Sequence, residues 1–316
     1  MRVVVLTNMY PTDERPVFGI FVQEQVEDLR ALGVDVEVLF FDGRASRRNY
    51  LRAVRAVRRI VREQRPDLVH AHYGLTGAVA LCQRRAPVVT TFHGSDSSGE
   101  IRWQAAVSWE VARLSTPIFV STHLADHLKL SNASIVPAAV DTDVFRPRDR
   151  GEARRTLGWP DDVAYALLLG SRAVRLKRAD LFDAGVEHAR AVAPELRATS
   201  LEGLTRAEVA TVMAAVDVAV LTSDNEGSPV TVREALASCT PVVSVAVGDV
   251  PTVLAGLPGC AIVEREPVAI GAAIVAAIRA GRPGELRERA AGYSRPIVAR
   301  KIVDVYETVL AQAGRK

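Results

Sequence analysis

Short apolar runs alternate along this chain with longer segments in which apolar residues recur every three or four positions. The short runs have the length of buried strands, and the longer segments have the period of amphipathic helices. In the first half, the pattern predicts strands at 2–6, 34–41, 68–71, 87–92, 117–120 and 134–137, and helices at 20–32, 46–64, 74–82, 101–114 and 122–130. Strands that alternate with helices pair in parallel, so this half predicts one doubly wound α/β domain.

The second half repeats this alternation. We expect strands at 164–170, 196–200, 217–221, 241–245 and 261–263, and helices at 179–192, 206–215, 229–237, 248–254, 268–280 and 296–313. Residues 141–155, between the halves, are polar, include Pro147 and show no periodicity, which is typical of a linker. The pattern therefore predicts an α/β protein with two domains, at 1–145 and 150–295.

Composition narrows the function classes. With 316 residues, of which 48% are hydrophobic, the chain can bury two cores of ordinary size. A net charge of +3 is only mildly basic, so charge by itself does not indicate nucleic acid binding. Cys82, Cys239 and Cys260 lie far apart in apolar surroundings, and we interpret them as buried side chains of a reducing compartment. No apolar run reaches the roughly 18 residues of a membrane span, and the apolar start of the chain is too short for a signal peptide. We expect a cytoplasmic protein.

The turn between the expected strand 217–221 and the next helix has the composition of an anion site. Gly227 and Ser228 precede Pro229, which we place at the first helical position, so backbone N–H groups should point out of a positive helix end. Glu226 lies in the turn, and Glu234 follows eight positions later within the helix. A carboxylate beside a bound phosphate lowers affinity, so these two more plausibly bind neutral hydroxyl groups. The combination predicts a sugar nucleotide as ligand.

A second set of cations follows the strand 164–170. Arg172, Arg175, Lys177 and Arg178 come within one short loop, and such a cluster after a first strand predicts a phosphate clamp. In the other half, Gly19 marks a loop-to-helix junction where the backbone can approach a ligand closely. In the same half, His93 directly follows the predicted strand 87–92. It therefore lies at the carboxyl end of that strand, where open parallel sheets bind ligands.

Three further patterns have two interpretations each. His70 and His72 would face one side of a strand, which suits a metal, but no third ligand is evident nearby. Asp141 and Asp143 form a DxD pattern, which we interpret as part of the linker. We therefore expect no metal. Helix 46–64 carries seven arginines against one Glu63, which fits either a solvated face or a surface for anionic lipid head groups.

Several stretches together resemble glycosyltransferase family 4, retaining enzymes of the GT-B fold. TNMYPTDERPVFGIFVQEQVEDL, PDLVHAHYG, TTFHGSD and VPAAVDTDVFRP resemble the family's donor-facing loop, strand signatures and interdomain linker. LLLGSRAVRLKRADL resembles its diphosphate clamp, and SDNEGSPVTVREALASCTPVV its Glu-x7-Glu signature, the most specific of the set. The similarity extends over nearly the whole chain, although Ala138 and Ala139 replace the usual Asn-Gly of the linker and only Gly19 stands in the first loop.

The resemblance implies a role for each candidate residue. Glu226 would bind sugar hydroxyls and Glu234 the ribose, while His93 would line the donor sugar. Arg172 or Arg175, with Lys177, would neutralise the leaving diphosphate. The remaining donor-binding positions would present backbone groups to the phosphates; they are Gly19, Gly227, Ser228, Pro229 and Val230. The catalytic set implied is His93, Arg172, Lys177 and Glu226, although Glu226 could instead act as a base or nucleophile.

The implied architecture is two Rossmann-like domains facing across a cleft, with helix 296–316 packed back on the first domain. The implied activity is a hexosyltransferase-type reaction that moves a sugar from a nucleotide-diphosphate sugar to a hydroxyl of a glycan, lipid-linked or small-molecule acceptor and releases the nucleotide diphosphate. No cofactor and no nucleic acid are expected, and membrane contact would be peripheral, through helix 46–64. The alternatives are a GT-B sugar-nucleotide epimerase and a non-catalytic protein that binds sugar nucleotides.

Overall fold

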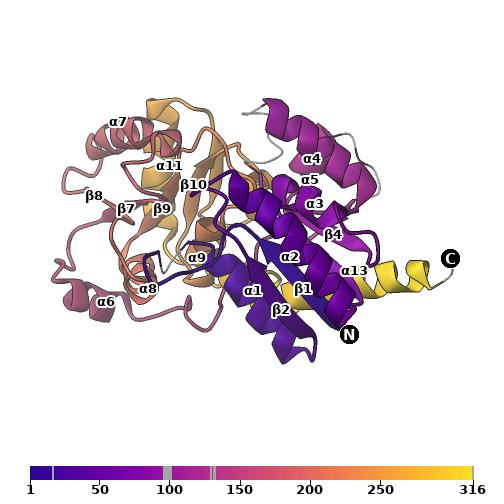
Figure 1. Ribbon diagram of the computed structural model, residues 1–316. Helices are drawn as coiled ribbons and strands as arrows, with labels where there is room; N and C mark the ends of the chain where they lie inside the picture. Colours follow the sequence, from indigo (N-terminus) through magenta and orange to yellow (C-terminus); the bar gives the residue numbers. More distant parts are fainter. Residues whose placement is uncertain (16–17, 95–101, 129, 131–132, 315–316) are drawn as a thin grey trace. The chain divides into compact units, whose positions relative to one another are not determined.

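The chain forms two units in this computed structural model, which describes residues 1–15, 18–94, 102–128, 130 and 133–314. One unit consists of Met1–Pro137 together with Arg295–Lys316, and the other of Ala138–Ser294. Each unit has its own parallel sheet with helices on both faces (Figure 1). The prediction of two Rossmann-like α/β domains is therefore confirmed.

The first unit is built on six parallel strands in the order β2-β1-β3-β4-β5-β6. They are β1 (Arg2–Thr7), β2 (Asp35–Phe40), β3 (Leu68–His72), β4 (Val88–Phe92), β5 (Thr116–Phe119) and β6 (Ser134–Ile135). All five residues of β3 and of β4 are buried, as expected for central strands covered on both faces.

The helices of the first unit lie on the two faces of this sheet. They are α1 (Ile20–Ala31), α2 (Arg48–Gln64), α3 (Gly74–Leu81), α4 (Arg102–Leu114), α5 (Thr122–His127) and α13 (Arg295–Ala313). Because side chains alternate along a strand, Val69 and Ala71 of β3 join the apolar cluster of α2 and α3, whereas His70 faces the opposite side and contacts Tyr306 of α13. α13 packs against α1, and Arg295 at its start bonds Asp28 of α1 at 2.9 Å.

The second unit has five parallel strands in the order β11-β10-β9-β7-β8. They are β7 (Tyr165–Leu168), β8 (Arg197–Ser200), β9 (Val218–Leu221), β10 (Val242–Val245) and β11 (Ala261–Val263). Its helices are α6 (Arg150–Leu157), the short 3-10 helix η1 (Arg175–Lys177), α7 (Ala179–Arg190), α8 (Arg206–Ala215), α9 (Val230–Ala237), α10 (Val250–Leu254), α11 (Pro267–Ala280) and α12 (Glu285–Ala291).

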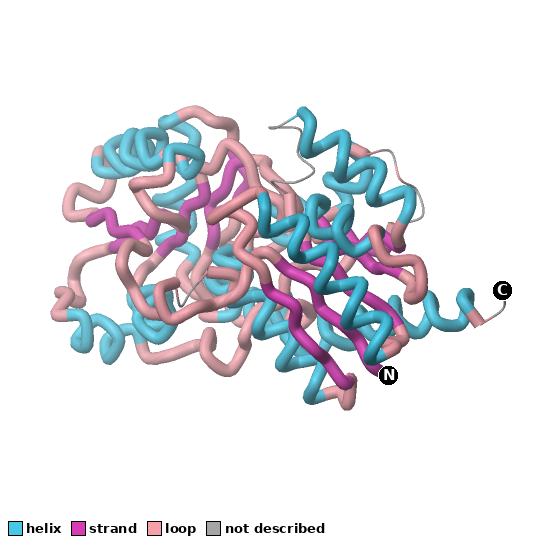
Figure 2. The backbone as a smooth tube through the Cα atoms, in the orientation of Figure 1, coloured by secondary structure: helices cyan, strands magenta, loops and turns pink. Residues whose placement is uncertain are grey.

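Two apolar clusters, one on each face of this sheet, form the core of the second unit. One contains β7, β9 and β10 side chains packed against α7 and α11, and the other packs the alternate side chains against α8, α9, α10 and α12. Figure 2 shows the strands between the flanking helices. In this order β7 connects to β8 on one side, and β9 connects to β10 on the other. Open α/β sheets bind ligands at such a switch point, beyond the carboxyl ends of the strands.

The linker prediction for 141–155 is wrong over its second half, because α6 begins at Arg150. Asp149 caps this helix by accepting a hydrogen bond from the backbone N–H of Glu152 at 2.7 Å. The helix lacks an apolar period because Arg154 lies on its buried face, only 1% exposed, where its guanidinium bonds Asp217 at 2.7 Å. A paired charge therefore occupies a position at which the periodicity rule expects an apolar residue.

Candidate functional site

The loops after β7 and β9 meet at the switch point of the second sheet. The Thr222 hydroxyl donates to the backbone carbonyls of Lys177 at 2.8 Å and Arg178 at 3.1 Å. The backbone N–H of Asp224 donates to the carbonyl of Leu176 at 2.8 Å. These hydrogen bonds join the cationic loop directly to the turn that contains Glu226. The two segments are far apart in sequence, since Lys177 and Glu226 are separated by 49 positions.

Lys177 and Glu226 form an ion pair at this point. The Nζ–Oε1 distance is 2.5 Å, and the side chains are 24% and 16% exposed. The aliphatic part of Lys177 lies over Gly170, where an added Cβ would come within 2.8 Å of its Cγ and Cδ atoms. The structure therefore brings together one predicted diphosphate contact and one predicted hydroxyl-binding carboxylate, in a partly buried place where both can still reach a ligand.

The start of α9 differs from the prediction in one respect. Pro229 precedes the helix as its N-cap, with an extended ψ of 113°, and Val230 is the first helical residue. Proline is compatible with both positions, so composition did not distinguish them. The Ser228 hydroxyl donates to Asp249 at 2.9 Å and accepts from the backbone N–H of Ala138 at 3.3 Å. These bonds hold the hydroxyl within the protein, so its predicted phosphate contact would have to come from backbone groups.

Gly248 allows its own backbone to pack closely against the turn that contains Gly227. Gly248 has a φ of +54°, and a Cβ there would lie 2.7 Å from the carbonyl oxygen of Gly227. The next residue, Asp249, pairs with Arg233, which is fully buried in α9 and lies over the Tyr293 ring at 4.5 Å. The sequence patterns did not identify Arg233 and Asp249, and the available signal was a single arginine next to Glu234 in a helix that is mostly apolar.

Glu234 lies deeper, on α9. It is 6% exposed, and its Oε1 atom is 4.0 Å from the guanidinium of Arg206 at the start of α8. Arg206 also lies over the ring of Phe145, at 5.2 Å. A carboxylate can accept hydrogen bonds from hydroxyl groups, so this position suits the predicted contact with a ribose. Arg206 carried no motif that would have identified it, because its relation to Glu234 depends on the packing of α8 beside α9.

Two of the other cations of the predicted clamp, Arg172 and Arg178, pair with carboxylates of their own. Arg172 bonds Asp183 at 2.7 Å, and this hydrogen bond raises the pKa of Arg172. Arg178 bonds Asp180 at 2.8 Å and Asp224 at 3.1 Å. Arg175 is exposed on η1. Of the four, Lys177 is the one that contacts Glu226, and the choice between Arg172 and Arg175 for a diphosphate stays a prediction.

Arg265 is a further cation that sequence analysis missed. It donates to the carbonyl of Ser223 at 2.8 Å and to that of Thr222 at 3.3 Å. These carbonyls belong to the loop that leads from β9 to Glu226, so the two hydrogen bonds from Arg265 stabilise the conformation of that loop.

Gly19 of the first unit is the N-cap of α1, with a φ of +75°. A Cβ there would lie 2.5 Å from the carbonyl carbon of Met9. The close approach of the preceding loop to its own helix therefore requires glycine, whether or not a ligand binds. The donor-binding role of Gly19 stays a prediction.

Three histidines gather at the carboxyl ends of β3 and β4. His72 Nδ1 lies 3.0 Å from His93 Nε2, and the rings of His70 and His72 stack at 4.6 Å. Burial lowers the pKa of His93 to about 3. Tyr73, in a left-handed conformation with a φ of 77°, places its ring 5.0 Å from that of His93. Residues 95–96 of the TTFHGSD motif lie outside the described residues.

The residues of the HxH and DxD patterns, which suggested a metal site, have other hydrogen-bond partners in the structure. His70 contacts the hydroxyl of Tyr306 at 2.5 Å and that of Thr91 at 2.7 Å. The Asp141 carboxylate accepts hydrogen bonds from the backbone N–H groups of Asp143 and Val144, both at 3.0 Å, which forms a local turn. Over the described ranges, no three His, Cys, Asp or Glu side chains are grouped as metal ligands.

Burial of His70 makes stability depend on pH. Burial, with a smaller contribution from His93, lowers the pKa of His70 to about 3 from an ordinary 6.5. The unfolded chain binds a proton below pH 6.5 that the native chain excludes, so stability is lost as pH falls from 6.5 towards 3. For His70 this amounts to about 2 kcal/mol between pH 7 and pH 5. Denaturant unfolding of the parent and of His70→Asn at both pH values should show a loss of stability that is about 2 kcal/mol smaller in the variant, because His72 and His93 remain buried in both. An equal pH effect in both would contradict the assignment, and His188→Asn, at an exposed position, is the control.

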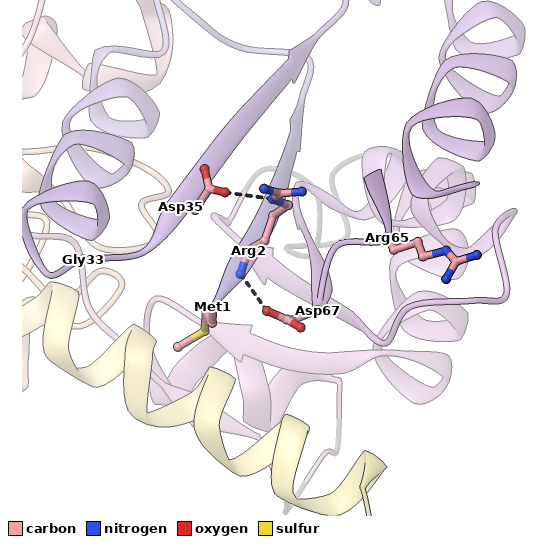
Figure 3. A pocket seen from close by; sticks show the side chains of 6 residues that line it. All are labelled: Met1, Arg2, Gly33, Asp35, Arg65 and Asp67. Carbon is pink, nitrogen blue, oxygen red and sulfur yellow. Dashed lines mark hydrogen bonds and ion pairs between the residues drawn. The ribbon is translucent and has the colours of Figure 1, made fainter. Parts of the chain in front are cut away.

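A hollow of about 340 Å³ lies at the opposite, amino edge of the first sheet (Figure 3). Arg2 crosses it, bonding Asp35 through Nε at 2.8 Å and Asp67 through its backbone N–H at 2.7 Å. It contains no predicted site residue, and ligands of open α/β sheets bind at the carboxyl edge instead.

No described helix combines the length and the apolar character that a bilayer crossing requires.

Comparison with known proteins follows the division into two units. The model of Glycosyltransferase Family 4 matches residues 1–144, and that of Glycosyl transferases group 1 matches residues 172–280. The chain is 28% identical to a teichuronic acid biosynthesis glycosyltransferase, TuaC, of Bacillus subtilis (strain 168), over 79% of this chain and 82% of TuaC. It is 29% identical to D-inositol 3-phosphate glycosyltransferase of Geodermatophilus obscurus over 67% of this chain, and it spans 59% of that relative.

Solved structures share the fold at low sequence identity. Sucrose-phosphate synthase from Thermosynechococcus elongatus superposes with a TM-score of 0.83 at 17% identity, covering 99% of this chain and all of the other. Anabaena Alr3699/HepE in complex with UDP superposes with a TM-score of 0.72 at 14% identity, covering 98% of this chain and all of the other. At these identities the likeness establishes the fold.

Proposed function

Because the chain belongs to glycosyltransferase family 4, we propose that it transfers a sugar from a nucleotide-diphosphate sugar to a hydroxyl group of an acceptor, with retention of anomeric configuration. The nucleotide diphosphate would be the second product. The observation that carries this proposal is the Lys177–Glu226 ion pair at the switch point of the second sheet. It supports the proposal because an ammonium group, which suits a leaving diphosphate, lies beside a carboxylate, which suits sugar hydroxyls.

The reaction breaks the bond between an anomeric carbon and a diphosphate oxygen. Negative charge develops on the diphosphate as this bond lengthens, and a fixed ammonium group aimed at it lowers the barrier. We assign this role to Lys177, whose side chain is 24% exposed. Arg172 or Arg175 would also pair with the diphosphate. For Arg172 this means exchanging its ion pair with Asp183 for one with the ligand.

The other predicted residues would hold the donor. Backbone groups of Gly227, Ser228, Pro229 and Val230 would face the phosphates at the start of α9. Glu234, buried beside Arg206, would accept hydrogen bonds from the ribose. For Gly19 and His93, in the first unit, the donor-binding roles are those that the family resemblance implies.

A binding role for Glu226 is supported by its ion pair. If Glu226 attacked the anomeric carbon, its carboxylate would have to move away from Lys177. At the same moment, Lys177 would be needed to stabilise the leaving diphosphate. Retention would then follow from attack of the acceptor hydroxyl on the face from which the diphosphate departs, as the resemblance to the family implies.

Two neighbours suggest where to begin with substrates. HepE has been solved in complex with UDP and with UDP-glucose, which supports testing UDP-sugars first. Several relatives are named as D-inositol 3-phosphate glycosyltransferases, and TuaC is named for teichuronic acid biosynthesis. A phosphorylated polyol and a cell-surface glycan precursor are therefore the first acceptors to test.

The Glu226→Gln variant tests the proposal. Release of nucleotide diphosphate from UDP-, GDP- and dTDP-sugars is measured by a coupled assay, with and without acceptors. We expect acceptor-dependent release by the parent and a rate at least tenfold lower in the variant, because the amide loses the charge that pairs with Lys177. The exposed Glu195→Gln exchange in the same unit is the control. Conversion of donor without acceptor would indicate an epimerase, and binding without release a non-catalytic protein.

We also propose that α2 contacts anionic lipid head groups peripherally. Its buried face is Ala53, Val57 and Val61, and its exposed face is basic and includes Leu51, 65% exposed. Arg52, Arg55 and Arg59 are spaced to share one exposed face. Such a helix binds membranes through charge and a few apolar side chains.

Vesicle sedimentation tests this contact. The parent should sediment with vesicles that contain anionic lipid and not with zwitterionic ones, and salt should weaken the binding. Replacing Arg52, Arg55 and Arg59 by glutamate should abolish sedimentation, whereas the same exchange at exposed Arg84, Arg85 and Arg102 should leave most of it. Equal loss in both triple variants would mean that net charge, and not α2, is responsible.

A further inference from the structure

Gln25, His72 and His93 form a chain of hydrogen bonds in the first unit. Gln25 is on α1, His72 ends β3, and His93 follows β4. The Gln25 side-chain nitrogen Nε2 lies 3.3 Å from His72 Nε2, and His72 Nδ1 lies 3.0 Å from His93 Nε2. The rings of His72 and His93 stack nearly parallel, at 5.2 Å and 20°.

The direction of these bonds follows from the donor at one end. A side-chain amide nitrogen donates and does not accept, so His72 must accept at Nε2. A neutral imidazole carries one ring proton, so the proton of His72 is on Nδ1 and is donated to His93 Nε2. His93 therefore accepts at Nε2, which places its own proton on Nδ1.

These proton positions hold when both rings are neutral, and burial of the rings keeps them neutral near pH 7. Burial, with smaller contributions from the neighbouring histidines His70 and His93, holds the pKa of His72 well below its ordinary value. Burial lowers that of His93 to about 3. Phe21 adds to this apolar environment, with its ring centre 4.9 Å from that of His93.

His70 shows what happens without an amide partner. Its Nδ1 contacts the hydroxyl of Tyr306 and its Nε2 that of Thr91. A hydroxyl can donate or accept, so these partners leave the tautomer of His70 open. The amide of Gln25 sets a direction that hydroxyl groups do not.

We infer that Gln25 is a positioning residue, which acts through His72 to fix His93 as the tautomer protonated on Nδ1. In this state the proton of His93 is on Nδ1, and its Nε2 lone pair is engaged by His72. The Nε2 lone pair is then not available to remove a proton from a substrate, so His93 would not act as a general base through this atom. This functional meaning rests on the proposed role of His93 in binding the donor sugar.

Nuclear magnetic resonance of histidine-labelled protein tests the inference without any substrate. Long-range proton–nitrogen spectra distinguish the two neutral tautomers, and the signals are assigned by loss in His93→Gln and His72→Gln. In the parent we expect single Nδ1–H tautomers for both residues. In Gln25→Met, which removes the donor at similar length, we expect His93 to populate both tautomers. Gln23→Met, on the same helix, should leave the parent spectrum.

A parent spectrum with the His93 proton on Nε2 would overturn the inference even if no variant folded. An unchanged Nδ1–H signal in folded Gln25→Met would also overturn it. Nucleotide diphosphate release is then measured for the same variants. If the tautomer changes while the rate stays at the parent value, the hydrogen-bond chain is supported, and the proposed contribution of His93 to transfer is wrong.

Discussion

Replacement of Lys177 by methionine is expected to lower the turnover of the donor by about 100- to 1000-fold, which is the usual effect of removing one group that stabilises developing negative charge. Methionine keeps much of the aliphatic stem that lies over Gly170, so packing is largely retained. Steady-state release of nucleotide diphosphate measures the effect. The fall should appear mainly in kcat, because the charge on the diphosphate grows as the bond breaks.

A matched control exists at Lys301, an exposed lysine of α13, where the same exchange should leave turnover at the parent rate. Combining Lys177→Met with Glu226→Gln should cost little more than Lys177→Met alone, because residues that act as a unit are not additive. Additive losses would show that the two side chains act separately. A parent-like rate in Lys177→Met would remove the ion pair from the mechanism.

Replacement of Asp217 by alanine is expected to lower the free energy of unfolding by about 3–5 kcal/mol, because it leaves a buried guanidinium without its counter-charge. Asp217 accepts from Arg154 at 2.7 Å and from the backbone N–H of Tyr165 at 2.7 Å, and it also pairs with Arg150. It thereby ties α6 to the ends of two neighbouring strands. Denaturant unfolding measures the loss.

Asp162→Ala removes an exposed carboxylate of the same unit and should change stability by less than about 0.5 kcal/mol. If the ion pair is responsible, Arg154→Met and Asp217→Ala together should destabilise by less than the sum of the two single changes. A loss below about 1 kcal/mol in Asp217→Ala would show that water or another group compensates Arg154.

Periodicity recovered most of the fold because it records local preferences. Strand β11 and helix α8 have the predicted bounds, and most other elements end within a few residues of their prediction. The failures have a physical cause. α6 and α12 are rich in charged residues, and α6 buries Arg154 through a pairing with a residue 63 positions away. A pattern that treats every arginine as exposed cannot find such a helix.

By itself, the sequence determined the order of most elements, the Glu-x7-Glu spacing of Glu226 and Glu234 and the family, since these depend on local composition and on motifs. Tertiary structure decided which side chains meet. Strand order brings Lys177 to Glu226, while Arg172 pairs with Asp183 instead. Packing of α1 beside β3 places Gln25 on His72. The physical reason is that a charge or hydrogen bond acts over a few ångströms in space, and distance along the chain does not measure that separation.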